Sequence, residues 1–536
     1  MKGMVVAPEP LAAEAGASIF KKGGNAIDAS IAAMFVQGVV NPMLCGIGGT
    51  GLMFVHIEEL NKTVLIDCSC TMGSGKVPKE WEANYIGRSE AYGRYILKDE
   101  ENQIGYKSIM IPGVVMGAWE AFQKYGSGQV TWKELLYPAV TYAKDGFKVY
   151  PYIAEFWSGR SAASPGYPSL DFKMDQSKAA SSLYGTPRKT GEWFVQGKYG
   201  NTLEKLAKHG GNDFYTGEIG EKIAKDLELH EAFISKDDLA NYDVFETEPL
   251  LGTYRGYEIR AAVSGCSSSP QIVSMLQIME GFDLNKYEHN SPAYIDLLSR
   301  AMRASFVDHV KLKGDPPLSI AMNLLPKYTS KERAEFWQEK IKKDPISGTS
   351  YPTGLGSDTT HVSVIDELGN AVSWTHTLGS LAGSGVITEE LGFLYNNFVG
   401  HFNPLQGYWD SIIPGKRGGG GSPLLIYKDG ELVMAIGAPG GSRIFTAIMQ
   451  VLINVIDFDM SLKEAVEAPR FHSEEKDIIY LEPSLSEEIE KELSKTYKVI
   501  RSSYMSRVQA VWKDPSSGAF TAGADPRGGK GEAVIA

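Results

Sequence analysis

Cysteines and long apolar runs are both scarce in this sequence, and each shortage excludes a class of protein. Four cysteines occur in 536 residues, namely Cys45, Cys68, Cys70 and Cys266. No two pairs have the spacing of a zinc site, so we expect buried free thiols in a reducing compartment. No apolar run approaches the roughly 18 residues that span a bilayer, and residues 1–8 lack the apolar region of a signal peptide. These shortages predict a cytoplasmic location without a membrane partner.

Positive charge and metal-binding patterns are scarce as well. The formal net charge is −12, so the basic footprint of a nucleic-acid-binding protein is missing. The nine histidines form neither an H-x-x-x-H nor an H-E-x-x-H pattern, and we predict no metal. The glycine-rich residues 45–51 lack the Lys-Ser/Thr of a phosphate loop, so they predict a tight turn that leads into a strand. We expect no cofactor.

The order of predicted elements indicates an α+β fold. Leu11, Ala15 and Ile19 share one helical face, Gly23 and Gly24 end that helix, and a second helix follows. Much of residues 110–310 reads as helical, and residues 330–345 read as a charged, solvated stretch. Antiparallel hairpins come later, and a helix begins near Ser442. The predicted strands are residues 52–56, 63–67, 362–366, 371–377, 424–427 and 432–437. Stacked sheets with helices on both outer faces fit this order.

Thr359 is the first candidate for chemistry. It precedes a predicted strand and follows a long loop, within the run Ser-Asp-Thr-Thr-His at residues 357–361. A hydroxyl here can attack the Asp358–Thr359 peptide bond, and the amine that is freed can then serve as the base for the same hydroxyl. Alone, a Thr-Thr pair that opens a strand is ordinary, because threonine favours strands.

Three further features strengthen this interpretation. Thr377 shares one strand face with Thr375 on the neighbouring strand, although it can equally be a plain sheet threonine. Gly440 and Gly441 lie between a strand and a helix, where backbone N–H groups can form an oxyanion hole or merely a glycine-rich turn. Asn397, preceded by a second asparagine, either orients a substrate or closes a turn.

Together these motifs resemble the γ-glutamyltranspeptidase family of N-terminal nucleophile hydrolases. The resemblance covers nearly the whole chain, in residues 23–29, 46–49, 142–147, 214–217, 254–257, 358–361, 369–372, 439–443 and 524–527. It implies a four-layer αββα sandwich and autocleavage between Asp358 and Thr359. Residues 1–358 would form a large chain and residues 359–536 a small chain of one interlocked fold. It also implies that Thr359 is the nucleophile, Thr377 its supporting hydroxyl, and the Gly440 and Gly441 backbone the oxyanion hole.

The departures from the family concern the substrate. Gly379, Phe398 and His401 stand where the transpeptidases hold an α-ammonium with Asn, Gln and Asp. Burying that charge without partners costs several kcal/mol, so a γ-glutamyl group should be rejected. Glycines replace the family's Ser-Ser pair, yet their N–H groups can still bind an anion. These are Gly420 and Gly421.

Two aspects of the pocket stay open in the sequence. The family's anion-binding arginine best matches Arg94, with Arg88 as a second choice, although either can be a solvated surface residue. Residues 402–417 are short compared with the lid loop of many transpeptidases. A more open pocket favours water over an amine acceptor, and therefore hydrolysis.

The sequence therefore predicts a self-processing amidohydrolase that acts, through an acyl-enzyme, on a small-molecule amide without an α-ammonium. Its partners would be that substrate and the two chains of the precursor. The sequence decides neither whether the two-chain unit forms a homodimer nor whether the enzyme also transfers the acyl group to an amine. A true γ-glutamyl hydrolase or transpeptidase is the first alternative. An unprocessed, inactive binding protein is the second.

Overall fold

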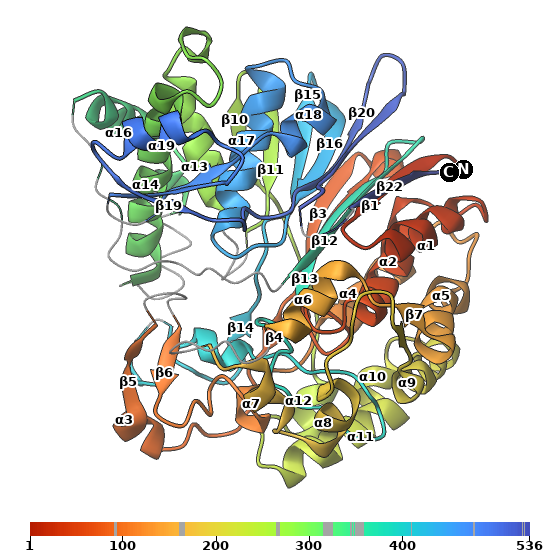
Figure 1. Ribbon diagram of the computed structural model, residues 1–536. Helices are drawn as coiled ribbons and strands as arrows, with labels where there is room; N and C mark the ends of the chain where they lie inside the picture. Colours follow the sequence, from red (N-terminus) through yellow and green to blue (C-terminus); the bar gives the residue numbers. More distant parts are fainter. Residues whose placement is uncertain are drawn as a thin grey trace.

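Two antiparallel sheets lie face to face in the centre of the molecule, and helices cover their outer sides (Figure 1). The structure is a computed structural model. It describes residues 1–89, 94–159, 167–263, 269–314, 325–343, 346, 348, 359–408, 410–474, 477–527, 529 and 531–536. Cys266 and Asp358, both named above, lie outside the described residues. Cys45, Cys68 and Cys70 are buried free thiols, as expected.

The first sheet has seven strands that come from both ends of the chain. Its order is β22-β1-β12-β13-β2-β3-β9. The strands are β1 (Gly3–Ala7), β2 (Thr50–Ile57), β3 (Lys62–Cys68), β9 (Phe245–Thr247), β12 (Thr360–Asp366), β13 (Ala371–Thr377) and β22 (Glu532–Ile535). β1 therefore lies between β12 and β22, two strands that come after residue 359. The predicted hairpin of β12 and β13 is confirmed, with Thr360 opposite His376.

The helices over the first sheet begin and end where the sequence signals predict. α1 (Pro10–Phe20) has a proline in its first turn, and Gly23 with a positive φ follows its end. α2 (Ala26–Val40) starts with a capping box, because Asn25 and Asp28 bond each other's backbone N–H groups. α2 is buried along its whole length, since it packs against α1, β12 and α5 (Trp132–Asp145).

The second sheet carries the predicted hairpin at residues 424–437 in its centre. Its order is β10-β11-β15-β16-β20-β21. The strands are β10 (Leu250–Tyr254), β11 (Tyr257–Ala261), β15 (Leu424–Lys428), β16 (Glu431–Gly437), β20 (Gln509–Lys513) and β21 (Phe520–Ala524). α13 (Ser269–Glu280), α14 (Pro292–Gly314) and α17 (Arg443–Ile456) form one apolar core with its outer face.

A third apolar layer joins the two sheets and completes the αββα sandwich. Val6, Phe54 and Ile365 of the first sheet pack there against Leu425 and Val511 of the second. The architecture predicted from the family resemblance is therefore present. In the part of the chain that the structure describes, no helix combines the length and apolar character needed to cross a membrane.

In its described part, the charged stretch of residues 330–345 is more ordered and less solvated than its composition indicates. Residues 331–343, expected to be a solvated stretch, form α16 (Lys331–Lys343). Ala334, Trp337 and Ile341 are buried on one face, and the Trp337 indole donates to Asp308 of α14 at 2.7 Å. Charged residues fill the other faces, which is why the segment reads as solvated.

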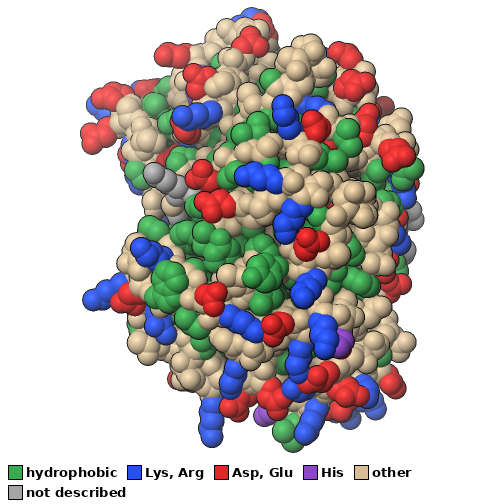
Figure 2. Space-filling model, turned by 90° about the vertical axis from the view of Figure 1, so that its right-hand side faces the viewer, with side chains coloured by type: hydrophobic (Ala, Val, Ile, Leu, Met, Phe, Trp, Pro, Cys, Tyr) green, Lys and Arg blue, Asp and Glu red, His purple; other side chains and the backbone are tan. Residues whose placement is uncertain are grey.

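The surface drawn in Figure 2 carries both signs of charge. Lys and Arg side chains are interspersed there with Asp and Glu, and apolar side chains gather in one area at the left of the view. That described face thus presents mixed charge rather than a basic stripe, in line with the negative net charge.

Candidate active site

Thr359 lies at the start of β12, at the end of the first sheet. β12 begins at Thr360, which pairs with His376, and one further step in this register brings Thr359 opposite Thr377. His361 points toward the second sheet, because its ring lies against Gly437, where an added Cβ would be 2.2 Å away. Since side chains alternate along a strand, Thr359 and Thr377 share that direction.

Thr377 ends β13 and is 3% exposed. Its Oγ1 accepts a hydrogen bond from the Gly379 N–H at 3.0 Å. On its other side it pairs with Thr50 of β2. A hydroxyl fixed in this way can stabilise a neighbouring nucleophile, as predicted from the alternation of residues 375 and 377.

Gly440 and Gly441 form the turn between β16 and α17. Their φ angles are +143° and +60°, a backbone that favours glycine. A Cβ on Gly440 would lie 2.9 Å from the Ser506 hydroxyl and 3.0 Å from the Tyr504 hydroxyl. β16 ends against His361 of β12, and α17 starts at Arg443, so the turn leads from beside the nucleophile strand into a helix N-terminus. Backbone N–H groups there favour a developing negative charge.

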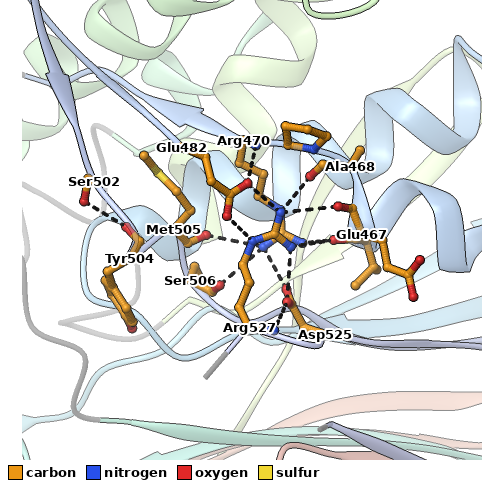
Figure 3. A network of polar contacts seen from close by, with 12 residues as sticks. Glu467, Ala468, Arg470, Glu482, Ser502, Tyr504, Met505, Ser506, Asp525 and Arg527 are labelled. Atoms are coloured by element: carbon orange, nitrogen blue, oxygen red, sulfur yellow. Dashed lines mark hydrogen bonds and ion pairs between the residues drawn. The ribbon is translucent and has the colours of Figure 1, made fainter. Parts of the chain in front are cut away.

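Ser506, which contacts this turn, belongs to a network of polar contacts around two arginines, Arg470 and Arg527 (Figure 3). The Ser506 hydroxyl donates to the Pro439 carbonyl at 2.6 Å, immediately before Gly440. Arg470, which is buried, donates to the Ser506 carbonyl at 3.3 Å and pairs with Asp525 at 2.8 Å. Arg527 binds Glu482 through two hydrogen bonds of 2.6 and 2.8 Å. The sequence marked residues 524–527 only as a family motif and gave no hint of this contact.

Two buried histidines lie in β12 and β13, and no sequence pattern indicated their contacts. His361 contacts the Thr375 hydroxyl at 2.8 Å and the Ser363 hydroxyl at 3.0 Å. His376, on the helix side of β13, contacts Gln37 of α2 at 2.9 Å. Burial lowers the pKa of each to about 3, so both are neutral near pH 7. They act as fixed hydrogen-bonding groups of the sheet.

Gly379, Asn397 and Phe398 come together two residues beyond Thr377. Gly379 has a φ of +101°, and an added Cβ would lie 2.6 Å from the Asn397 Oδ1 and 3.1 Å from the Phe398 ring. Asn397 donates to the Gln103 carbonyl at 2.9 Å and to the Ser380 hydroxyl at 2.7 Å, so its Oδ1 faces Gly379. Phe398 is buried. The space that a side chain at position 379 would fill is thus taken by the Asn397 amide oxygen and the Phe398 ring.

Arg94 is buried beside this group rather than solvated on the surface. It is 6% exposed, and its guanidinium donates to the Gly379 carbonyl at 2.7 Å and to the Gln103 side chain at 2.9 Å. Arg88, the second choice from sequence, instead forms an ion pair with Asp410 at 3.0 Å and is about two-fifths exposed. The structure thus brings Arg94, and not Arg88, to Gly379.

Three other predicted residues lie around the same space. His401 is exposed and stacks on Phe398, with ring centroids 4.6 Å apart. Gly421 packs on β13, where an added Cβ would be 2.7 Å from Thr375, and its φ is +134°. Gly420, next to it, has open space on its Cβ side.

Lys173 is a buried cation that the sequence did not reveal. It lies on the short helix α7 (Leu170–Met174) and is fully buried. Its ammonium donates to the Ser380 hydroxyl at 2.5 Å and to the Leu381 carbonyl at 2.7 Å. Because Ser380 is 207 residues away in the chain, no local pattern could have predicted this contact.

The sandwich and the position of Thr359 define the class of protein. Stacked antiparallel sheets between helical layers, with a central strand that follows directly after Thr359, form the fold of an N-terminal nucleophile hydrolase.

Comparison with known proteins identifies the family within that class. The chain matches the family described as "Gamma-glutamyltranspeptidase" over residues 12–535, and it belongs to that family. It is 34% identical to the Acylase ACY 1 proenzyme of Pseudomonas sp. (strain V22), over 94% of this chain and 88% of the relative. It is 31% identical to the Glutathione hydrolase proenzyme of Escherichia coli (strain K12), over 98% of this chain and 90% of the relative. The chain is therefore an enzyme that acts on amide bonds.

A solved structure agrees with this assignment over the full length. The crystal structure of cephalosporin acylase from Bacillus halodurans superposes with a TM-score of 0.86 and 25% identity, covering 99% of this chain and 95% of that one.

Proposed function

We propose that the chain is the precursor of a two-chain amidase that uses Thr359 as its nucleophile. Cleavage would separate residues 1–358 from residues 359–536. The Thr359 hydroxyl attacks the carbonyl carbon of Asp358, the peptide C–N bond breaks, and an ester replaces it. Water then hydrolyses the ester, which leaves a carboxyl group on Asp358 and a free amine on Thr359. Two similar relatives are named as proenzymes, which supports this step.

In the mature enzyme the same hydroxyl attacks the substrate amide. Its proton passes to the Thr359 amine, and the Gly440 and Gly441 N–H groups stabilise the oxyanion. The C–N bond then breaks, the proton goes to the departing amine, and an acyl ester remains on Thr359. Water attacks this ester, releases the acid and restores the hydroxyl. Thr377 keeps the Thr359 hydroxyl directed at the substrate carbonyl carbon in each of these steps.

The closed space at Gly379 is the observation that carries the substrate proposal. No side chain fits at this position without moving Asn397 or Phe398. A substrate ammonium placed there would lose its water and meet only the Phe398 ring and one amide oxygen, that of Asn397, without a carboxylate partner, which is unfavourable. The acyl group should therefore lack an α-ammonium. The similarity to enzymes named as acylases supports this choice.

Two buried cations indicate that the acyl group carries a negative charge. Arg94 binds the Gly379 carbonyl, and Lys173 binds Ser380, the next residue. A carboxylate near Gly379 would lie in the positive field of both side chains. Gly420 and Gly421 could add backbone N–H groups that bind an anion. A small dicarboxylic acid, bound through one end as an amide, fits this description.

Two anilides that differ only in the ammonium would test the proposal. Glutaryl-p-nitroanilide and γ-glutamyl-p-nitroanilide share their leaving group and chain length. We expect the glutaryl compound to be hydrolysed about 100-fold more efficiently, from the cost of an unpaired ammonium. Efficient γ-glutamyl cleavage would instead favour a glutathione-type enzyme, the activity for which one relative is named.

A denaturing gel distinguishes the enzyme from an inactive binding protein. The parent chain should split into two bands over time. A single full-length band after long incubation, without hydrolysis of any amide, would contradict the proposal. Cytoplasmic location and a homodimer of the two-chain unit stay predictions, for cell fractionation and sedimentation to test.

A further inference from the structure

Glu9 is a fully buried carboxylate that the proposed chemistry does not use. It lies between β1 and α1, where its backbone carbonyl accepts the Ala12 and Ala13 N–H groups. A buried charge is costly unless it is hydrogen-bonded or paired. Its surroundings therefore need an explanation.

Four side chains from three other elements donate hydrogen bonds to this carboxylate. Thr360 donates to both oxygens, at 3.0 and 3.1 Å. The remaining donors are Gln37 at 2.7 Å, Asn41 at 2.7 Å and Tyr152 at 3.0 Å. Burial raises the pKa of Tyr152 far above its usual value, so the phenol stays a donor. The two oxygens of the Glu9 carboxyl group thus accept hydrogen bonds from four donor side chains.

The Thr360 hydroxyl is held from both sides. It donates to Glu9 and accepts a hydrogen bond from the Gln37 amide at 3.0 Å. That amide also donates to the His361 carbonyl at 3.2 Å. Gln37 in turn is oriented by His376, whose ring nitrogen lies 2.9 Å from its carbonyl oxygen. The first two residues of β12 are thereby fixed to α2 and α1.

A buried arginine connects this carboxylate with the oxyanion turn. Arg507 is 4% exposed, and its guanidinium lies 4.9 Å from the centre of the Tyr152 ring. Its Nε and Nη2 have no hydrogen-bond partner among the described residues. Its backbone N–H donates to the Pro439 carbonyl at 3.4 Å, next to Gly440. Burial would lower the pKa of Arg507, but neighbouring groups that include Tyr152 and Glu9 raise it.

We propose that Glu9 is a positioning residue, which holds Thr360 and thereby aims the preceding residue, Thr359, at the oxyanion turn. The inference rests on the proposed role of Thr359 as nucleophile. Reacting groups must lie within a few tenths of an ångström of their productive geometry, and a displacement of about 1 Å costs about 100-fold in rate. Thr359 starts the strand, so the hydrogen bonds of Thr360 are the nearest fixed contacts on its C-terminal side.

A double-mutant cycle with E9Q and T360V tests this role. We expect each substitution to slow autoprocessing and to lower kcat by about 10- to 100-fold, with KM within about twofold, because only alignment is lost. The double variant should be no slower than either single one, since both remove the same contact. T360S retains the hydroxyl and should stay near the parent.

Asp308→Asn is the matched control. Asp308 is another buried carboxylate, which accepts from Trp337 at 2.7 Å and from Arg333, far from β12. Its loss should lower Tm and leave kcat and KM unchanged, which separates a positioning effect from a general loss of stability.

The outcomes are distinct. If the parent neither splits nor cleaves any amide, the proposed function fails. If the parent does both and E9Q matches it within about twofold, only the role of Glu9 fails. Should E9Q not fold, as judged by circular dichroism, T360V and T360S carry the test alone, and equal rates for these two would overturn the inference.

Discussion

The two ends of the candidate site differ in how far they depart from the transpeptidase pattern. At the proposed reaction end, Thr359, Thr377 and the Gly440 turn match the residues that the family resemblance implies for the chemistry. At the proposed acyl-binding end, Gly379 and Phe398 stand where the resemblance places the partners of an ammonium. The comparison teaches that one scaffold can keep its catalytic strand ends while loops a few residues further along alter recognition.

Removing the nucleophile should have the largest effect. Thr359→Ala removes the hydroxyl needed for both steps, so the chain should stay uncut and amide hydrolysis should fall to the background rate. Time-resolved gels and anilide assays measure this. Thr359→Ser is the control, and it should still split, because a primary hydroxyl remains. A T359A variant that still splits would contradict the proposed role of Thr359 as the nucleophile.

Removing the supporting hydroxyl should have a smaller effect. Thr377→Val keeps the shape of the side chain but leaves the nucleophile without its partner. We expect kcat to fall about 10- to 100-fold, from the loss of one positioned hydrogen bond in the site. Steady-state kinetics on both anilides should show equal losses. Unequal losses would mean that Thr377 belongs to recognition instead.

Restoring polar groups at the acyl-binding end should shift selectivity moderately. Phe398→Gln together with His401→Asp places an amide and a carboxylate where the ammonium would lie. We expect the preference for the glutaryl over the γ-glutamyl anilide to fall by about 10-fold, because only part of the missing contacts returns. Gly379 is left unchanged, since a side chain there meets Asn397. An unchanged ratio would contradict the proposed reason for rejection.

Acidification should act on the stability of the fold rather than on a single catalytic step. His361 and His376 have folded-state pKa values of about 3, below the usual value near 6.5. The unfolded chain therefore binds protons first as the pH falls. Stability is complete above about pH 6.5 and is lost toward pH 3, by up to about 1.4 kcal/mol per pH unit for each histidine. Urea unfolding of the uncut T359A variant near pH 7 and near pH 5 measures this, and H376Q should lose less.

Much of the fold could be predicted because its signals are local. The caps around Asn25 and Asp28 and the glycines at 440–441 act over a few residues, so they are visible in the sequence. α16 was missed because three apolar positions are hidden among charges. The family itself could be identified from its ordered motifs, while the roles of Thr359 and Thr377 stay predictions.

The contacts that could not be predicted from the sequence join residues that lie far apart in the chain. Glu9 and Thr360 are 351 residues apart, and Lys173 and Ser380 are 207 apart. The residues next to a buried charged residue in the sequence do not indicate which distant residue will form its hydrogen bonds. Arg94 illustrates the same limit, since its sequence context fits a surface residue as well as the buried one observed.

The place of β1 between β22 and β12 has a consequence for the lifetime of the protein. Before a cut at residue 358 the sheet can fold as one chain, with its two halves always at a high local concentration. After the cut, the same sheet would be a complex of two polypeptides, held by backbone hydrogen bonds on both edges of β1. Its reassembly would then depend on protein concentration. A mature enzyme that unfolds once would therefore be far less able to recover than its precursor, and its useful life would be governed by its rate of unfolding.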